Sequence, residues 1–237
     1  MKKDVIIACD FPSKKDVIHF LNLFSHEKPF VKIGMELFYS EGPEIVREIK
    51  KKEHKIFLDL KLHDIPNTVE RAMRILSKLD VDMVNLHVSG TVKMMQAALK
   101  GLTREDGTRP LLIGVTQLTS INDQELSEEL MINGTMDEVV INYAKLALTA
   151  GIDGVVCSPL EAEKVKNACG ASFIAVTPGI RFKDSKKDDQ SRITTPYEAS
   201  TIGCDYIVVG RPITQAQDPV GAYRRCVEEF VNGKETI

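Results

Sequence analysis

The stretch Lys55-Ile56-Phe57-Leu58-Asp59-Leu60-Lys61-Leu62-His63-Asp64-Ile65-Pro66-Asn67-Thr68 passes from an apolar strand into a loop. Pro66 stiffens the loop because its ring fixes φ and removes an N–H donor. Residues two apart on an extended chain point to the same side, so Asp59 and Lys61 are expected to share a face. Burying either charge alone costs roughly several kcal/mol, so an interior strand seldom carries both. Charges at the end of such a strand therefore indicate an active site.

Short runs rich in Val, Ile, Leu and Phe recur along the rest of the chain. Most are apolar throughout, which is typical of parallel strands covered on both faces. The eight predicted strands are 5–9, 30–34, 55–61, 82–87, 111–116, 154–158, 173–177 and 206–210. Amphipathic stretches predict helices over 14–24, 44–51, 69–79, 92–102, 136–150, 160–168, 196–202 and 220–231, with a short extra helix around 123–130.

Eight strands that alternate with helices favour an α/β fold, a (β/α)8 TIM barrel, formed as a single domain over residues 1–237. The alternative is an open doubly wound sheet. The even spacing of eight units and the missing G-x-G-x-x-G motif argue against that sheet.

Charge and cysteine content narrow the functional classes. The net charge is only −3 and no polybasic block occurs, so nucleic acid and membrane surfaces are not expected partners. No apolar stretch is long enough to span a bilayer. The five cysteines are scattered and form no C-x-x-C pair, which predicts reduced thiols in a cytoplasmic protein.

Polar residues gather where the predicted strands end, which is where a barrel of this class places its active site. They are Asp10, Lys32, Asp59, Lys61, Asp64, His87, Thr116, Thr119, Arg181 and Arg211. Simpler explanations remain open for some of them. Asp59 and Lys61 could form a structural ion pair, and Asp64 could cap the following helix. His87 has no spaced partners that would make it a metal ligand, and His54 is interpreted as surface.

A phosphate site is predicted after the last strand, where Gly210-Arg211-Pro212 follows four apolar residues. Glycine lets an anion approach the backbone amides, and the arginine fork suits phosphate. The loops after strands seven and eight are the usual phosphate position in such barrels. The polar segment 182–195 is too poor in apolar residues to pack, so it is either a mobile lid or an inert excursion.

The sequence Asp59-Leu60-Lys61-Leu62-His63-Asp64-Ile65-Pro66-Asn67-Thr68 resembles the D-x-K-x-x-D-I-P-N-T signature of the orotidine 5′-monophosphate decarboxylases, in their bacterial form. Later stretches, Thr177–Arg181, Asp189–Arg192 and Val209–Ile213, are similar to motifs of that family in the same order. The resemblance covers essentially the whole chain and implies conversion of orotidine 5′-monophosphate to uridine 5′-monophosphate, the last step of de novo pyrimidine nucleotide synthesis.

The resemblance also implies a role for each site residue. Lys61 is expected to donate the proton, within a charge network of Lys32, Asp59 and Lys61 from one subunit and Asp64 from the other. The active sites of a homodimer would thus be shared. The expected substrate-binding residues are Asp10 and Lys32 at the ribose, Asp59, Thr68 from the partner, Thr119 at the pyrimidine, Gly210 and Arg211 at the phosphate, and Arg181 and Gln190 in a closing loop.

The same resemblance implies that no cofactor and no metal take part. The alternative is a magnesium-dependent sugar-phosphate decarboxylase or aldolase on the same barrel, since those relatives share D-x-K-x-x-D. They are expected to carry a carboxylate where Lys32 stands, so the lysine argues against that alternative. A non-catalytic nucleotide-binding barrel would leave the lysine–carboxylate cluster without a purpose.

Overall fold

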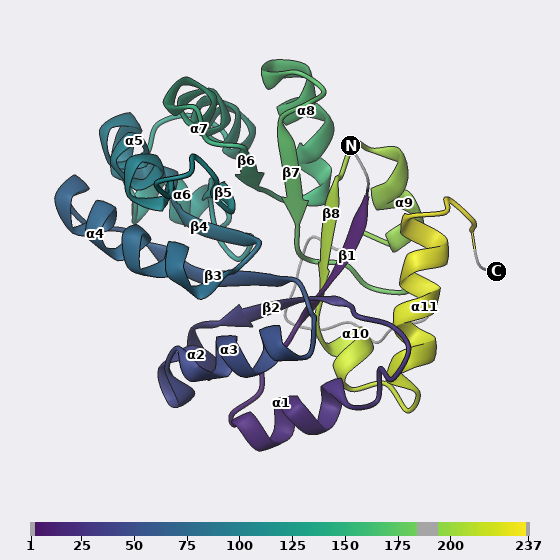
Figure 1. Ribbon diagram of the computed structural model, residues 1–237. Coiled ribbons are helices and arrows are strands. Elements are labelled where there is room, and N and C mark those ends of the chain that lie inside the picture. The colour runs from purple at the N-terminus through teal and green to yellow at the C-terminus, as the bar shows by residue number, and fades with distance from the viewer. Residues whose placement is uncertain (1–2, 184–193, 236–237) are drawn as a thin grey trace.

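The computed structural model describes residues 3–183 and 194–235. Its eight strands form a closed, all-parallel barrel in which each strand pairs with its neighbours in sequence and β8 pairs with β1 (Figure 1). The strands are β1 Asp4–Ala8, β2 Phe30–Gly34, β3 Ile56–Leu62, β4 Met83–His87, β5 Leu111–Val115, β6 Gly154–Val156, β7 Ile174–Thr177 and β8 Tyr206–Val209. The predicted (β/α)8 barrel is confirmed, with strand bounds that differ by two residues at most.

Helices surround the strands (Figure 1). They are α1 Lys14–Leu21, α2 Met35–Glu41, α3 Glu44–Lys51, α4 Pro66–Leu76, α5 Thr91–Leu102, α6 Asp123–Glu128, α7 Met136–Ala150, α8 Pro159–Cys169, α9 Pro196–Thr201, α10 Arg211–Thr214 and α11 Pro219–Phe230, with 3-10 turns η1 Ser77–Leu79 and η2 Val88–Gly90. Helix α2 was not predicted from the sequence. This helix begins at Met35, directly after the last residue of β2. Its N-cap is Gly34, which has no side chain that could cap the helix and mark its beginning in the sequence.

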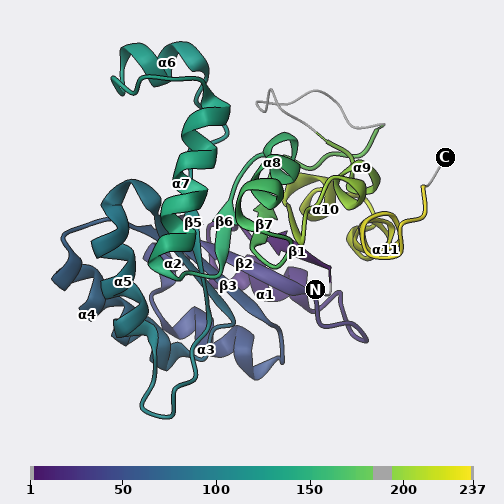
Figure 2. The same cartoon turned by 90° about the horizontal axis from the view of Figure 1, so that it is seen from above.

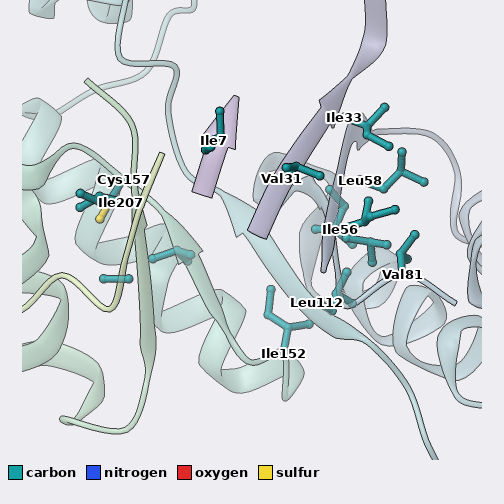
Figure 3. Close-up of a cluster of buried hydrophobic side chains, with 14 of the residues drawn as sticks. Ile7, Val31, Ile33, Ile56, Leu58, Val81, Leu112, Ile152, Cys157 and Ile207 are labelled. Atoms are coloured by element: carbon teal, nitrogen blue, oxygen red, sulfur yellow. The ribbon is translucent and has the colours of Figure 1, made fainter. Parts of the chain in front are cut away.

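The barrel has two separate apolar regions because side chains alternate along each strand. Outward-facing residues such as Ile7, Val31 and Leu58 pack under the helices (Figure 3). Inward-facing residues form a smaller cluster that fills the barrel interior: Ile6, Ala8, Phe30, Phe57, Met83, Ile113, Ile174, Val176 and Val208. Lys32, Asp59 and Asn85 follow Phe30, Phe57 and Met83 by two residues, so the same alternation places them in the barrel above this cluster.

Strand β3 is irregular at its carboxyl end. Its pairing with β4 runs through Leu58↔Val84 and resumes only at Leu62↔Leu86. Within this bulge Lys61 has φ of +51°, a left-handed conformation that residues other than glycine seldom adopt. The expectation that Asp59 and Lys61 lie on a regular extended strand is therefore wrong, although their side chains still meet.

Figure 2 shows α6 beyond the end of α7, apart from the other helices. His54 is not a surface residue as expected: only 1% of it is exposed, and its Nδ1 lies 2.9 Å from the carbonyl oxygen of Pro29. In the described ranges, no helix combines the length and apolar character that crossing a bilayer requires.

Candidate active site

A cavity of about 140 Å³ opens at the carboxyl ends of the barrel strands. Its floor includes Phe57, Val156, Val176 and Val208, which belong to the interior cluster or pack against it. The other lining residues are Lys32, Asp59, Lys61, Asn85, Val115, Gln117, Leu118, Thr119 and Pro178. The cavity is thus apolar below and charged along one side, at the position where barrels of this class bind their ligands.

Charges of alternating sign line that side of the cavity. Lys32 Nζ lies 3.0 Å from Asp10 Oδ1 and 3.2 Å from Asp59 Oδ2. Lys61 Nζ lies 2.6 Å from the other oxygen of Asp59, Oδ1. Asp10, Lys32, Asp59 and Lys61, contributed by the ends of β1, β2 and β3, therefore form one continuous network. The sequence analysis predicted this convergence, and these contacts produce it.

The network keeps its charges through mutual attraction. Burial of Asp59 acts to raise the pKa of its carboxyl group, but Lys32 and Lys61, with hydrogen bonds from Lys61 and Asn85, hold that pKa below its ordinary value. Burial of Lys32 acts to lower the pKa of its ammonium group, but Asp59 and Asp10 outweigh burial and raise it. Both groups are therefore ionised at neutral pH.

Asn85 on β4 belongs to the site, and sequence reasoning missed it. Its Nδ2 donates a hydrogen bond of 2.7 Å to Asp59 Oδ1, and its Oδ1 accepts one of 2.8 Å from the backbone N–H of Lys61. A signal was present in the sequence, since Asn85 is a polar residue flanked by apolar ones inside a predicted buried strand. A buried amide needs partners, so its position alone pointed to a polar neighbour.

Two histidines lie beside the network. The rings of His63 and His87 have centroids 5.6 Å apart. Burial, followed by His63 and Lys61, lowers the pKa of His87, so its imidazole is neutral at pH 7. Within residues 3–183 and 194–235, no three His, Cys, Asp or Glu side chains are grouped so that they could hold a metal ion.

Asp64 and Thr68 lie outside the cavity of this chain. Both are exposed. Asp64 Oδ1 accepts a hydrogen bond of 2.6 Å from the N–H of Ile65. The alternative in which Asp64 caps the next helix is wrong, because Ile65 occupies the N-cap position of α4.

The other predicted ligand contacts that the structure describes follow the carboxyl ends of β5, β7 and β8. Thr119 lines the cavity directly. Gly210 and Arg211 form the junction between β8 and α10, as the sequence predicted. Arg181 is buried. It directly follows Ile180, which forms an isolated parallel β-bridge with Thr194. Gln190 and most of the segment 182–195 lie outside the described residues.

A closed barrel of eight parallel strands, with a charged cavity at their carboxyl ends, has the architecture of the (β/α)8 enzymes, whose active sites lie at that face. The model of the orotidine 5′-phosphate decarboxylase / HUMPS family matches residues 3–226, and the chain belongs to that family. It is 54% identical to orotidine 5′-phosphate decarboxylase of Geobacillus thermodenitrificans (strain NG80-2), over 100% of both chains.

Two further relatives agree. The chain is 55% identical to orotidine 5′-phosphate decarboxylase of Staphylococcus aureus (strain Mu50 / ATCC 700699), over 98% of this chain and 100% of that one. The crystal structure of orotidine 5′-phosphate decarboxylase from Lactobacillus acidophilus superimposes with a TM-score of 0.86 at 40% identity. That match covers 96% of this chain and 99% of the other.

Proposed function

We propose that the protein decarboxylates orotidine 5′-monophosphate to uridine 5′-monophosphate, the last step of de novo pyrimidine nucleotide synthesis. The observation that carries the proposal is the Asp10–Lys32–Asp59–Lys61 network, of which Lys32, Asp59 and Lys61 line the cavity. The full-length similarity to proteins named orotidine 5′-phosphate decarboxylase supports the same reaction. The five free cysteines are compatible with the cytoplasmic location expected for it.

The proposed reaction needs a cation beside C6 of the pyrimidine ring. The bond between C6 of the pyrimidine and its carboxylate breaks, carbon dioxide leaves, and the electron pair stays on C6. The ammonium group of Lys61 stabilises this carbanion and then donates a proton to it. Asp59 supports the step because its Oδ1, 2.6 Å from Lys61 Nζ, accepts a hydrogen bond from the ammonium group and fixes its direction.

The apolar floor of the cavity contributes to the same step. Phe57, Val156, Val176 and Val208 exclude water from below the charged wall. Electrostatic interactions strengthen in such an environment, so Lys61 stabilises a developing negative charge more strongly than a solvated amine would. Asp59 lies in the same wall, and its repulsion of the substrate carboxylate is a further contribution that this geometry permits.

The rest of the nucleotide is held around the rim. Asp10 and Lys32 bind the ribose hydroxyls, and Thr119 binds the edge of the pyrimidine. Gly210 and Arg211 bind the phosphate, assisted by Arg181 and Gln190. The positions of Thr119 in the cavity wall and of Arg211 after β8 support this arrangement.

We extend the proposal to a homodimer with shared active sites. Asp64 and Thr68 are exposed and lie apart from the cavity of their own chain, as residues that serve a partner's site would. Ile65, between them, is an apolar residue with 66% of its surface accessible, and a subunit interface at Asp64 and Thr68 would bury it. Asp64 would then complete the charge network of the second subunit.

The alternative is a magnesium-dependent sugar-phosphate decarboxylase or aldolase. Such an enzyme needs carboxylates that are available to a cation. Here the ammonium group of Lys32 already lies between Asp10 and Asp59, within 3.2 Å of both. This arrangement favours the reaction without a metal.

The decisive experiment follows ultraviolet absorbance while the purified protein is incubated with orotidine 5′-monophosphate, with and without a chelator. We expect equal rates of conversion to uridine 5′-monophosphate in both samples. Loss of activity with the chelator and its recovery with magnesium would support the alternative. No turnover in either sample would contradict the proposed function.

A further inference from the structure

We propose that Asn85 is a positioning residue of the active site, which holds Lys61 and Asp59 in their reactive arrangement by bonding to both. The inference rests on the proposed decarboxylation for its kinetic readout. Asn85 is only 2% exposed, and it lines the cavity together with Lys32, Asp59 and Lys61. Both ends of its amide are occupied by the two residues that are expected to act on the substrate.

The orientation of this amide follows from its partners. A backbone N–H can only donate, so the atom 2.8 Å from Lys61 N is the carbonyl oxygen of Asn85. The ionised carboxylate of Asp59 can only accept, so the atom 2.7 Å from its Oδ1 is the amide nitrogen. A planar amide, with an NH₂ donor at one end and a carbonyl acceptor at the other, satisfies both positions at once.

The bulge in β3 explains why a side chain is needed here. Regular pairing with β4 stops at Leu58↔Val84 and resumes at Leu62↔Leu86. The N–H of Lys61 falls inside this gap and bonds to the side chain of Asn85 instead of to a backbone carbonyl. Lys61 is also held at φ of +51°, a conformation that persists only where surrounding contacts enforce it. The bond from Asn85 is the contact that anchors the Lys61 backbone.

The second bond fixes the other half of the pair. Asp59 Oδ1 accepts from both Asn85 Nδ2 and Lys61 Nζ, while Asp59 Oδ2 lies near Lys32 Nζ. Asn85 therefore determines which oxygen faces Lys61 and keeps the carboxylate from rotating. Since the alignment of a proton donor with its acceptor decides the rate, a small displacement here reduces turnover more than binding.

The first test compares Asn85→Ala with the wild type. We expect kcat to fall by about 10- to 100-fold, the effect of leaving buried groups unpaired or misaligned. The dissociation constant for uridine 5′-monophosphate should change by less than about 3-fold, because the residues at ribose and phosphate keep their positions. A crystal structure of the variant should show Lys61 outside the left-handed region, or its Nζ separated from Asp59. That readout does not depend on turnover.

The matched control is Asn22→Ala. Asn22 is exposed and its Oδ1 accepts a hydrogen bond from Lys52, so the substitution removes the same chemical group far from the network. Its kcat should equal that of the wild type. If the wild type itself does not turn over, the proposed function fails, and the geometry of Lys61 in Asn85→Ala still decides the inference about Asn85.

A second variant, Asn85→Asp, should change the pH dependence of kcat, which a general destabilisation of the fold would not do. The introduced carboxyl group can replace both bonds of the amide only when it is protonated. When ionised it repels Asp59, although Lys61 and Lys32 oppose part of that repulsion. The rings of His63 and His87 also lie beside the network, and burial lowers the pKa of His87. The kcat of Asn85→Asp should therefore be highest near about pH 5 and decline toward about pH 8 relative to the wild type, with Asn85→Leu low throughout.

The inference is overturned if Asn85→Ala keeps its kcat, or if its structure retains both the wild-type Lys61 backbone and the contact between Lys61 Nζ and Asp59. A pH profile of Asn85→Asp that runs parallel to the wild type would also overturn it. Nucleotide affinity and kcat falling together in Asn85→Ala would point to a general structural role instead.

Discussion

At the scale of single residues, Asp59 is the centre of the site. One of its oxygens accepts from Lys61 and Asn85, and the other pairs with Lys32. A buried carboxylate without partners would be costly, but the two lysines and Asn85 stabilise the charged form of Asp59. Its pKa is therefore held low despite burial. The sequence analysis named Asp59 and both lysines from their positions at strand ends. Asn85 was not predicted, because a single amide on β4 has no motif or residue spacing that connects it with Asp59 and Lys61 on β3.

Removing the Lys61 amine should abolish most turnover while ligand binding survives. We expect Lys61→Ala to lower kcat by at least ~10³-fold, since proton donation alone contributes about 10² to 10⁴. Stopped-flow or absorbance kinetics with calorimetry of uridine 5′-monophosphate binding would measure both effects. The exposed Lys78, changed to Ala, serves as the control. Near-normal turnover in Lys61→Ala would remove Lys61 from the mechanism.

His54 should make the stability of the fold depend on pH. Burial lowers the pKa of His54 below its ordinary value of 6.5. As pH falls through 6.5 the unfolded chain takes up a proton that the folded chain refuses, so the free energy of unfolding decreases. The loss for one proton is at most ~1.4 kcal/mol per pH unit.

Urea denaturation between pH 8 and 5 would measure this loss. We expect His54→Gln to show a shallower decline than the wild type over that range. The exposed His19, changed to Gln, should keep the wild-type slope. Identical slopes for His54→Gln and the wild type would show that His54 is protonated equally in both states.

At the scale of secondary-structure elements, α4 and α5 approach each other closely at Gly101. A Cβ atom added to Gly101 would lie 2.1 Å from the carbonyl oxygen of Glu70, which is a backbone atom of α4. The two helices can therefore lie against each other only because this position has no side chain. The sequence predicts both helices from their apolar periodicity, but it gives no indication that one glycine sets their separation.

Gly101→Ala should destabilise the protein by about 1–3 kcal/mol, the usual cost of overpacking. The sign of the change in the free energy of unfolding is diagnostic, because alanine in an uncrowded helix would stabilise the protein by ~1 kcal/mol relative to glycine. Urea denaturation would give the free energy of unfolding. Lys93→Ala, at an exposed position of the same helix, should change it by less than ~0.5 kcal/mol. A stabilised Gly101→Ala variant would mean that α4 and α5 lie farther apart.

Elements with strong local signals were predicted well. The bounds of β2, α3 and α7 agree with the sequence analysis, since Thr135 caps α7 and Gly151 ends it with a left-handed residue. Helix α2 was missed because it lacks a capping side chain. The β3 bulge could not be predicted, because its cause is the pairing of β3 with β4 and not any residue of β3 alone.

At the scale of the whole molecule, the barrel gathers residues that are far apart in the chain. Asp10, Lys32, Asp59 and Asn85 come from four consecutive strands, and parallel closure brings their carboxyl ends to one rim. The same closure leaves Asp64 and Thr68 on the outside. An active site that needs Asp64 must therefore be completed by a second subunit, which makes the proposed dimer part of the catalytic unit.

Mixing two inactive variants should restore activity if the sites are shared. Lys61→Ala and Asp64→Ala subunits, co-refolded in equal amounts, would form hybrid dimers with one intact site. Random two-fold pairing predicts recovery of about a quarter of the wild-type rate. Each variant refolded with itself is the control, and sedimentation would report the oligomeric state. No recovery from a sample that contains dimers would contradict the shared site.

The sequence by itself determined the eight-fold alternation of strands and helices and the charged residues at the strand ends. Both are local properties, because side-chain periodicity and strand polarity act within a few residues. Only the tertiary structure decided that Lys61 adopts φ of +51°, that Asn85 bonds to both members of the pair, and that His54 is buried. These depend on the register between segments distant in sequence, which no pattern within one segment encodes.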